Sequence, residues 1–172
     1  MSNKDMNDNQ PEEEAEAIEE NRQFLTFSVE NSVYALDIMT VREIKGWTEA
    51  TRIPNSPEYM RGVINLRGVV IPVYDLKCRF GNGTTEADDK NVVIYIAAGG
   101  RTLGILVDAV SDILTVKASQ VRPAPSSSPD IDIDDAYVSG LIGLEENMVI
   151  VLDVEHLVSS SVTDKVAAAS AA

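Results

Sequence analysis

YMRGVINLRGVVIPVYDL, residues 59–76, is the stretch that decides the fold. An apolar run over residues 63–66 is interrupted by Arg67-Gly68, and a second apolar run over residues 69–74 follows. Two short apolar runs separated by a break that contains glycine predict a strand, a tight turn and a second strand. A β-hairpin is therefore expected here.

The same stretch occurs a second time. Residues 137–154, YVSGLIGLEENMVIVLDV, align with it without a gap. Unrelated segments of this length would share about one residue. The identical pairs are Tyr59/Tyr137, Gly62/Gly140, Ile64/Ile142, Leu66/Leu144, Val73/Val151 and Asp75/Asp153. The match is an internal repeat, and a repeat has to be recognised before a fold is proposed.

The rest of the body repeats in the same order. Strands predicted over residues 24–29 and 33–38 are echoed by strands over residues 92–97 and 102–107. In each copy a V-x-x-I pair follows the second strand, at residues 41–44 and 110–113. The positions of the first pair map onto those of the second at a constant offset of 69 residues. The body therefore consists of two copies of one β-rich unit.

The two copies are expected at about 22–83 and 90–158, with strand exchange between them left open. No long amphipathic helix lies between the strands, which argues against a parallel α/β sheet. Short strands punctuated by glycine and proline favour small barrels or sandwiches. The predicted fold class is mainly β with a few short helices.

Composition and charge exclude several classes. The chain has 172 residues, a formal net charge of −14 and one cysteine, Cys78. Such a charge argues against nucleic acid or an anionic membrane as a partner of the whole molecule. No apolar run approaches the ~20 residues of a membrane helix. A single cysteine excludes an intramolecular disulfide and fits a reducing compartment, most simply the cytoplasm.

The charge is unevenly distributed. Residues 1–21 are acidic and nearly free of large apolar side chains, so a disordered tail is expected. Residues 161–172 are rich in alanine and serine and are expected to be a flexible tail. Residues 42–79 are instead net basic, with seven bases against four acids. An acidic chain therefore carries one basic region.

Catalytic and metal motifs are weak in this sequence. Asp75 and Asp153 each end an apolar strand, as in aspartic proteases, but neither is followed by the Thr/Ser-Gly that orients such a dyad. Capping of a following helical turn is the favoured role for both. The run DIDIDD, residues 130–135, lacks the glycine and glutamate of an EF-hand loop, so a solvated acidic loop is favoured. His156 has no Cys or His at zinc-ligand spacing, and Cys78 is expected to be a packed residue.

The two copies differ at one place that can carry function. Residues 65–68, NLRG, correspond to residues 143–146, GLEE, and Glu43 corresponds to Asp112. A duplicated fold keeps its packing residues in both halves, so function is expected where they differ. If these positions approach each other, Glu43 attracts Arg67, whereas the second copy brings two acids together. A plain turn role for Arg67 remains open.

Four segments resemble the bacterial chemotaxis coupling proteins, the CheW family. They are FLTFSVENSVYALDIMTVREIKGW, TRIPNSPEYMRGVINLRGVVIPVYDL, GILVDAVSDIL and YVSGLIGLEENMVIVLDVEHL. The resemblance covers about residues 22–160, and its most specific part is the run from Arg61 to Asp75. The related regulatory domain of the chemotaxis histidine kinase shares that run. The kinase's other domains do not fit in this length, so a stand-alone adaptor is the better match.

The resemblance implies two five-stranded SH3-like β-barrels packed side by side, with no enzymatic activity and no cofactor. It implies two partners, the cytoplasmic tip of chemoreceptors and the regulatory domain of the histidine kinase. It also implies a cytoplasmic location at membrane-associated receptor arrays, without membrane insertion. A same-fold adaptor in twitching motility or second-messenger control stays an alternative, as does a duplicated-lobe hydrolase.

The resemblance also assigns residues. The receptor tip is a helical hairpin, which is expected in a groove between the barrels. Val41, Glu43 and Arg67 match receptor-side positions of the family, and Asn65 joins them because the second copy lacks it. The expected structural turns are Gly62, Gly68 and Gly140.

Overall fold

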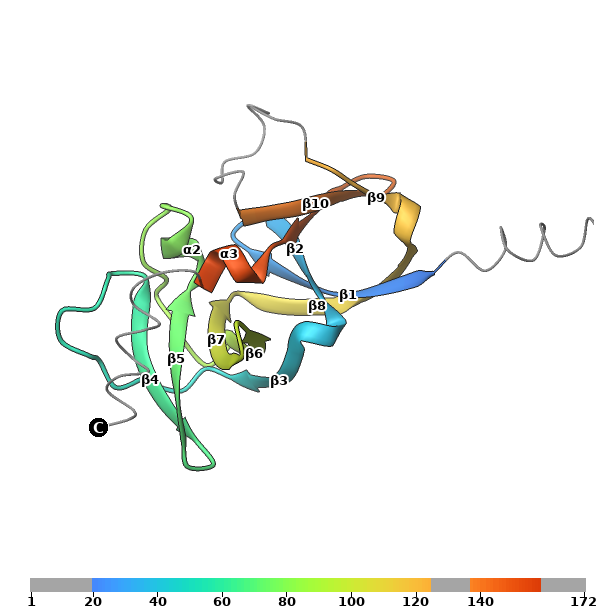
Figure 1. The fold of residues 1–172 in the computed structure, drawn as a ribbon. Coiled ribbons are helices and arrows are strands. Elements are labelled where there is room, and N and C mark those ends of the chain that lie inside the picture. The colour runs from blue at the N-terminus through green and yellow to red at the C-terminus, as the bar shows by residue number, and fades with distance from the viewer. Residues whose placement is uncertain (1–19, 125–136, 159–172) are drawn as a thin grey trace, which may run out of the picture.

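The computed structural model describes residues 20–124 and 137–158, and these form a β-rich body with short helices (Figure 1). The predicted 1–21 tail, the DIDIDD run and the 161–172 tail lie wholly or almost wholly outside the described residues. The elements in chain order are β1 (Asn21–Val29), β2 (Ser32–Asp37), η2 (Ile38–Thr40), β3 (Val41–Gly46), β4 (Met60–Leu66), β5 (Val69–Asp75), α2 (Leu76–Arg79), β6 (Val92–Ala98), β7 (Arg101–Val107), β8 (Ala109–Lys117), η3 (Ala118–Gln120), β9 (Val121–Arg122), β10 (Val138–Gly143), β11 (Met148–Leu152) and α3 (Val154–Val158).

The strands form two sheets. One has the order β8-β1-β2-β11-β10-β9 and the other β3-β6-β7-β5-β4. Neighbouring strands are antiparallel except for one parallel pair in each sheet, β2 with β11 and β5 with β7. We call the first sheet barrel A and the second barrel B.

Each barrel takes strands from both halves of the chain. Barrel A combines the first hairpin, β1–β2, with β8 to β11 of the second half. Barrel B combines β3, β4 and β5 with the hairpin β6–β7 of the second half. The halves at about 22–83 and 90–158 therefore do not each form a barrel of their own, because they exchange hairpins.

Both sheets close on themselves at equivalent points. In barrel A the two edge strands, β8 and β9, are one bent segment joined by η3. In barrel B the chain after β3 reaches β4, where Thr51 and Val63 exchange backbone hydrogen bonds of 2.9 and 2.8 Å. With β8 and β9 counted as one bent strand, each barrel has five strands. The prediction of two five-stranded SH3-like barrels is confirmed.

The largest apolar cluster lies between the barrels rather than inside one. It holds Phe27 and Leu36 of barrel A together with Ile94 and Ile96 of barrel B. On β6 these two isoleucines alternate with Val93, which belongs to the separate interior cluster of barrel B. Successive side chains of a strand point to opposite faces, so one strand serves both cores. The barrels are thus held together by a shared interior.

Candidate partner-binding surface

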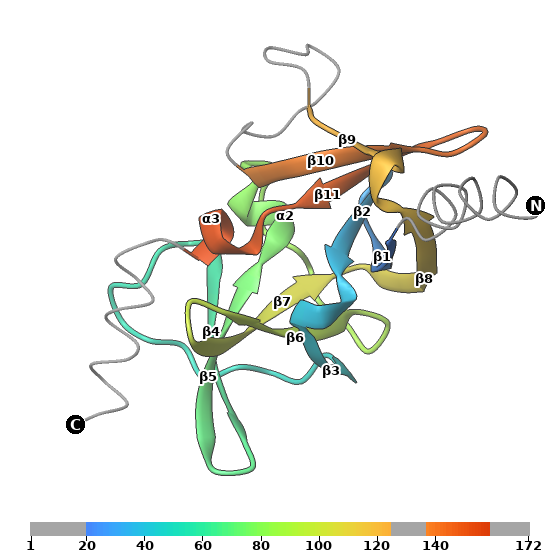
Figure 2. The same ribbon diagram turned by 45° about the vertical axis from the view of Figure 1, so that its right-hand side comes forward.

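The quoted hairpin is formed by β4 and β5, which project from barrel B in Figures 1 and 2. Arg67 and Gly68 make the two-residue turn, with φ of 53° and 86°. Positive φ at both central residues matches a type I′ turn, whose twist suits a hairpin. The Asn65 side-chain oxygen accepts a hydrogen bond from the Gly68 N–H at 2.8 Å. Asn65 therefore stabilises the turn that presents Arg67.

Glu43 on β3 meets Arg67 across this end of barrel B. The Arg67 guanidinium donates a hydrogen bond of 2.6 Å to Glu43 Oε1, and Lys45 Nζ lies 3.5 Å from the same oxygen. The hydrogen bond from Arg67 is the main cause that lowers the pKa of the Glu43 carboxyl. Side-chain exposure is 69% for Arg67 and 25% for Glu43, so the pair is open to a partner. The expected pairing of these two residues is confirmed.

Val41 begins β3 and has a different environment. A β-bulge between Val41 and Glu43 interrupts the pairing with β6. The Val41 side chain packs against the apolar cluster between the barrels. The structure thus puts Glu43, Asn65 and Arg67 at one end of barrel B and Val41 at the margin of the inter-barrel core. We call these four residues the β3–β4 surface.

Exposed apolar side chains adjoin this surface in sequence. Ile44 directly follows Glu43 and is 43% exposed, while Val69 and Val70 directly follow the turn and are 58% and 42% exposed. A protein that works by binding leaves such side chains uncovered where its partner docks. Apolar contacts are thus available on the two elements that carry the ion pair.

The second copy shows the same apolar positions without the ion pair. Ile113 and Met148, the repeat counterparts of Ile44 and Val70, are also exposed. Asp112 makes no ion pair among the described residues, and its Oδ1 accepts the backbone N–H of Ile113. The pair of Glu43 with a turn arginine is therefore specific to barrel B within the described residues.

Two of the three glycines predicted as turns have another role. Gly62 and Gly140 lie inside β4 and β10, each beside a β-bulge. A Cβ on Gly62 would come within 2.3 Å of the Thr51 carbonyl oxygen, and one on Gly140 within 2.8 Å of the Val121 side chain. The segment that closes each barrel crosses over this glycine. Gly68 does lie in the hairpin turn.

The two repeated aspartates have separate structural duties. Asp75 is fully buried, and its carboxylate accepts hydrogen bonds from the Thr85 N–H at 2.7 Å and the Thr85 hydroxyl at 2.6 Å. It also caps α2, and Asp153 caps α3, where it contacts the His156 ring at 2.7 Å. Both carboxylates are therefore engaged in structural hydrogen bonds. Burial raises the pKa of the Cys78 thiol, which lowers its reactivity.

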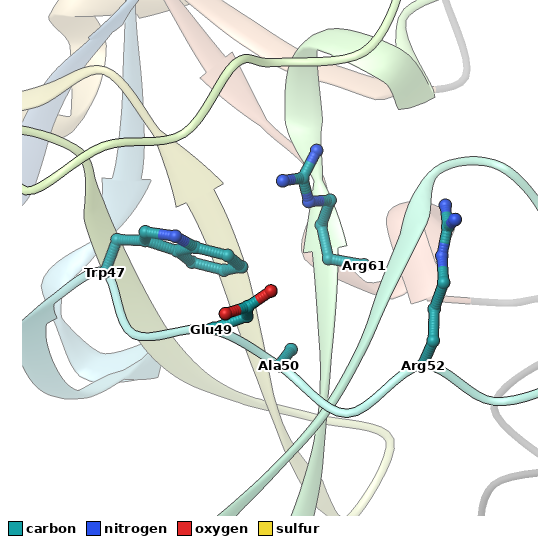
Figure 3. Close-up of a pocket in the computed structure, with 5 residues that line it drawn as sticks. All are labelled: Trp47, Glu49, Ala50, Arg52 and Arg61. Carbon is teal, nitrogen blue, oxygen red and sulfur yellow. The ribbon is translucent and has the colours of Figure 1, made fainter.

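A depression between the segment after β3 and the first residues of β4 was not foreseen from the sequence (Figure 3). It has a volume of about 340 Å³ and is lined by Trp47, Glu49, Ala50, Arg52 and Arg61. The Arg61 guanidinium lies 5.3 Å from the centroid of the Trp47 ring and donates a hydrogen bond of 2.8 Å to the Thr85 carbonyl. The sequence indicated this depression only through Arg52 and Arg61, two arginines of the basic region 42–79. The hydrogen bond of Arg61 to Thr85 already serves to hold the loop after α2.

Within residues 20–124 and 137–158, no three Asp, Glu, His or Cys side chains are grouped so as to hold a metal ion. In the same residues, no helix is long and apolar enough to cross a membrane.

The fold defines the class: two SH3-like barrels built by hairpin exchange, with an exposed ion pair where the copies differ. Comparison with known proteins is consistent with this class. The CheW-like domain family matches residues 23–162. The chemotaxis protein CheW of Klebsiella aerogenes is 42% identical over 139 residues, covering 81% of this chain and 82% of that protein. CheW of Bacillus subtilis is 32% identical over 155 residues, covering 90% and 94%.

A solved structure is similar as well. The scaffolding protein TtCheW from Thermoanaerobacter tengcongensis superposes with a TM-score of 0.75 at 33% identity, covering 83% of this chain and 91% of that one. The chain therefore belongs to the CheW family of chemotaxis scaffold proteins.

Proposed function

We propose that the chain couples chemoreceptors to the chemotaxis histidine kinase by binding both at once, without catalysing a reaction. The observation that carries the proposal is the exposed Glu43–Arg67 pair, which the second copy lacks. Family membership supports a scaffold role, and the carboxylates of Asp75 and Asp153 are engaged as caps of α2 and α3.

The β3–β4 surface is the receptor side in this proposal. Exposed apolar side chains of the adjoining strands, among them Ile44 of β3 and Val70 of β5, can contact the apolar face of a helix, which docks through residues spaced three and four apart. Arg67 has five N–H donors, and its hydrogen bond to Glu43 leaves others for a carboxylate or carbonyl of the receptor tip. The pair then orients the arginine before the receptor arrives.

The kinase regulatory domain takes a second surface, so that receptor and kinase are held in one assembly at the receptor array. A receptor state that changes the affinity on one surface then changes the binding free energy on the other. Such coupling is reciprocal, since each partner alters the affinity of the other by the same factor.

The test uses the isolated receptor tip and the kinase regulatory domain with the full chain and its Arg67→Glu variant. We expect the receptor-tip Kd to rise about tenfold or more, because loss of a charged contact costs at least about 1.4 kcal/mol. Kinase binding should be retained. Calorimetry measures both affinities, and circular dichroism checks that the fold survives.

Two variants serve as controls. Glu145→Arg changes the corresponding turn of barrel A and should leave receptor binding intact. The swap Glu43→Arg with Arg67→Glu should rebuild the pair and keep the surface folded. If Arg67→Glu binds both partners normally, the site assignment is wrong. If the unmodified chain binds neither partner, the function is wrong.

A further inference from the structure

Arg79, the last residue of α2, lies between two tyrosines of different barrels. Its guanidinium carbon is 4.3 Å from the ring centroid of Tyr59 and 5.1 Å from that of Tyr137. Its Nε is buried without a hydrogen-bond partner, and Arg79 makes no ion pair among the described residues. The contacts of the Arg79 guanidinium with the two tyrosine rings are therefore cation–π contacts, in which the ring face attracts the positive charge.

The two tyrosines are repeat counterparts. Tyr59 directly precedes β4 of barrel B, and Tyr137 directly precedes β10 of barrel A. The Tyr59 carbonyl accepts the N–H of Asp75 at 2.7 Å, and the Tyr137 carbonyl accepts the N–H of Asp153 at 2.8 Å. One cation thus contacts both barrels at the same point of the repeat. At the position of Arg79 the second copy has Leu157, which is buried, so the arrangement occurs once.

The arginine also joins two groups of aromatic rings. In one group Phe27, Tyr34, Phe80 and Tyr137 follow one another with centroid distances of 5.9, 5.2 and 6.1 Å. In the other, Tyr59 and Tyr74 are 5.8 Å apart. Arg79 contacts Tyr137 of the first group and Tyr59 of the second.

A guanidinium placed in this way is a poor source of stability. Burying Nε without a hydrogen bond carries a desolvation penalty that the ring contacts have to offset. An apolar side chain would avoid this penalty, and the second copy has a buried leucine, Leu157, at the corresponding position. What the cation supplies instead is orientation, since it attracts both ring faces and fixes where they lie relative to one another.

We propose that Arg79 is a positioning residue, which sets the orientation of barrel A relative to barrel B by holding Tyr59 and Tyr137 on one guanidinium. Val41 of the β3–β4 surface packs against the inter-barrel core, so this orientation also shapes the surface that meets the receptor. That last step rests on the proposed function.

A double-mutant cycle on the full chain tests the link. Tyr59→Leu, Tyr137→Leu and the double variant are unfolded in urea, in the unmodified background and again in the Arg79→Met background. Each single variant changes the unfolding equilibrium constant by some factor. With Arg79 present, we expect the factor for the double variant to be about fivefold smaller than the product of the two single factors, because either change alone breaks the bridge. In the Arg79→Met background the two effects should multiply. Multiplicative effects with Arg79 present, or equal coupling in both backgrounds, would overturn the proposal.

Orientation is measured separately, because a purely structural arginine would affect stability alone. Residual dipolar couplings of Arg79→Met should fit each barrel by itself but not both barrels in their original orientation. Arg79→Lys, which keeps the charge, should move the couplings less. If the couplings of Arg79→Met fit the two barrels in their original arrangement, Arg79 does not set their orientation.

The functional step has its own control. Arg79→Met should raise the Kd for the receptor tip several-fold, whereas Arg122→Met, at an exposed arginine of β9, should not. If the unmodified chain fails to bind the tip, the proposed function falls, while the cycle and the couplings still decide the role of Arg79.

Discussion

Arg67 combines an unfavourable backbone with an exposed charge. Its φ of 53° lies in the left-handed region, where a long side chain is uncommon and asparagine or glycine is preferred. An arginine at the first position of a type I′ turn is thus a compromise in stability. The compromise is understandable if the guanidinium is needed for binding.

Arg67→Asn should separate stability from binding. Asparagine suits the left-handed turn, while loss of an exposed ion pair costs little. We expect the free energy of unfolding in urea to stay within about 0.5 kcal/mol of the unmodified chain, or to rise, while receptor-tip affinity falls. A large loss of stability would instead identify Arg67 as a structural residue of the turn.

The carboxyl of Glu43 reports on the same pair. Its pKa lies below the ordinary value of 4.5, chiefly because of the Arg67 hydrogen bond. A lowered folded-state pKa gives a stabilisation that is present above the unfolded value and is lost as pH falls through the folded value. In Arg67→Met the Glu43 pKa, followed by carbon NMR of the carboxyl, should therefore rise. An unchanged pKa would show that the pair does not persist in solution.

At the scale of elements, sequence reasoning succeeded where the pattern is local. The hairpin of residues 59–76, its Arg67-Gly68 turn and the capping of α2 by Asp75 all follow from neighbours in the chain. The exchange of hairpins does not. Both copies present the same strand pattern, so pairing within a half and pairing between halves satisfy it equally well. The contact of Arg79 with two distant tyrosines likewise depends on tertiary packing.

Gly62 and Gly140 each lie where another segment of the chain crosses closely over the strand. Gly62→Ala would put a Cβ against the Thr51 carbonyl at a φ of 139°, where both space and backbone oppose it. We expect a loss of more than about 2 kcal/mol in urea unfolding. Gly143→Ala is the matched control, since nothing lies within 4 Å of its added Cβ and its φ is not positive. Equal effects of the two changes would refute the crossing as the reason for Gly62.

At the scale of the whole molecule, hairpin exchange and the shared core make two barrels into one folding unit. Neither barrel contains a continuous half of the chain, so neither can form without strands from the other half. The largest apolar cluster draws on both sheets. Unfolding should therefore be all-or-none, as is usual for single domains of this size.

A cavity in one barrel should consequently be felt in the other. Val149 is fully buried in the interior cluster of barrel A, and Trp47 packs against the interior cluster of barrel B. Val149→Ala should cost about 1–3 kcal/mol and lower the urea midpoint seen by Trp47 fluorescence as much as the midpoint seen by circular dichroism. Separate midpoints would mean that the barrels unfold independently. Coinciding midpoints would mean that a change in one barrel reaches the other through shared strands and a common core.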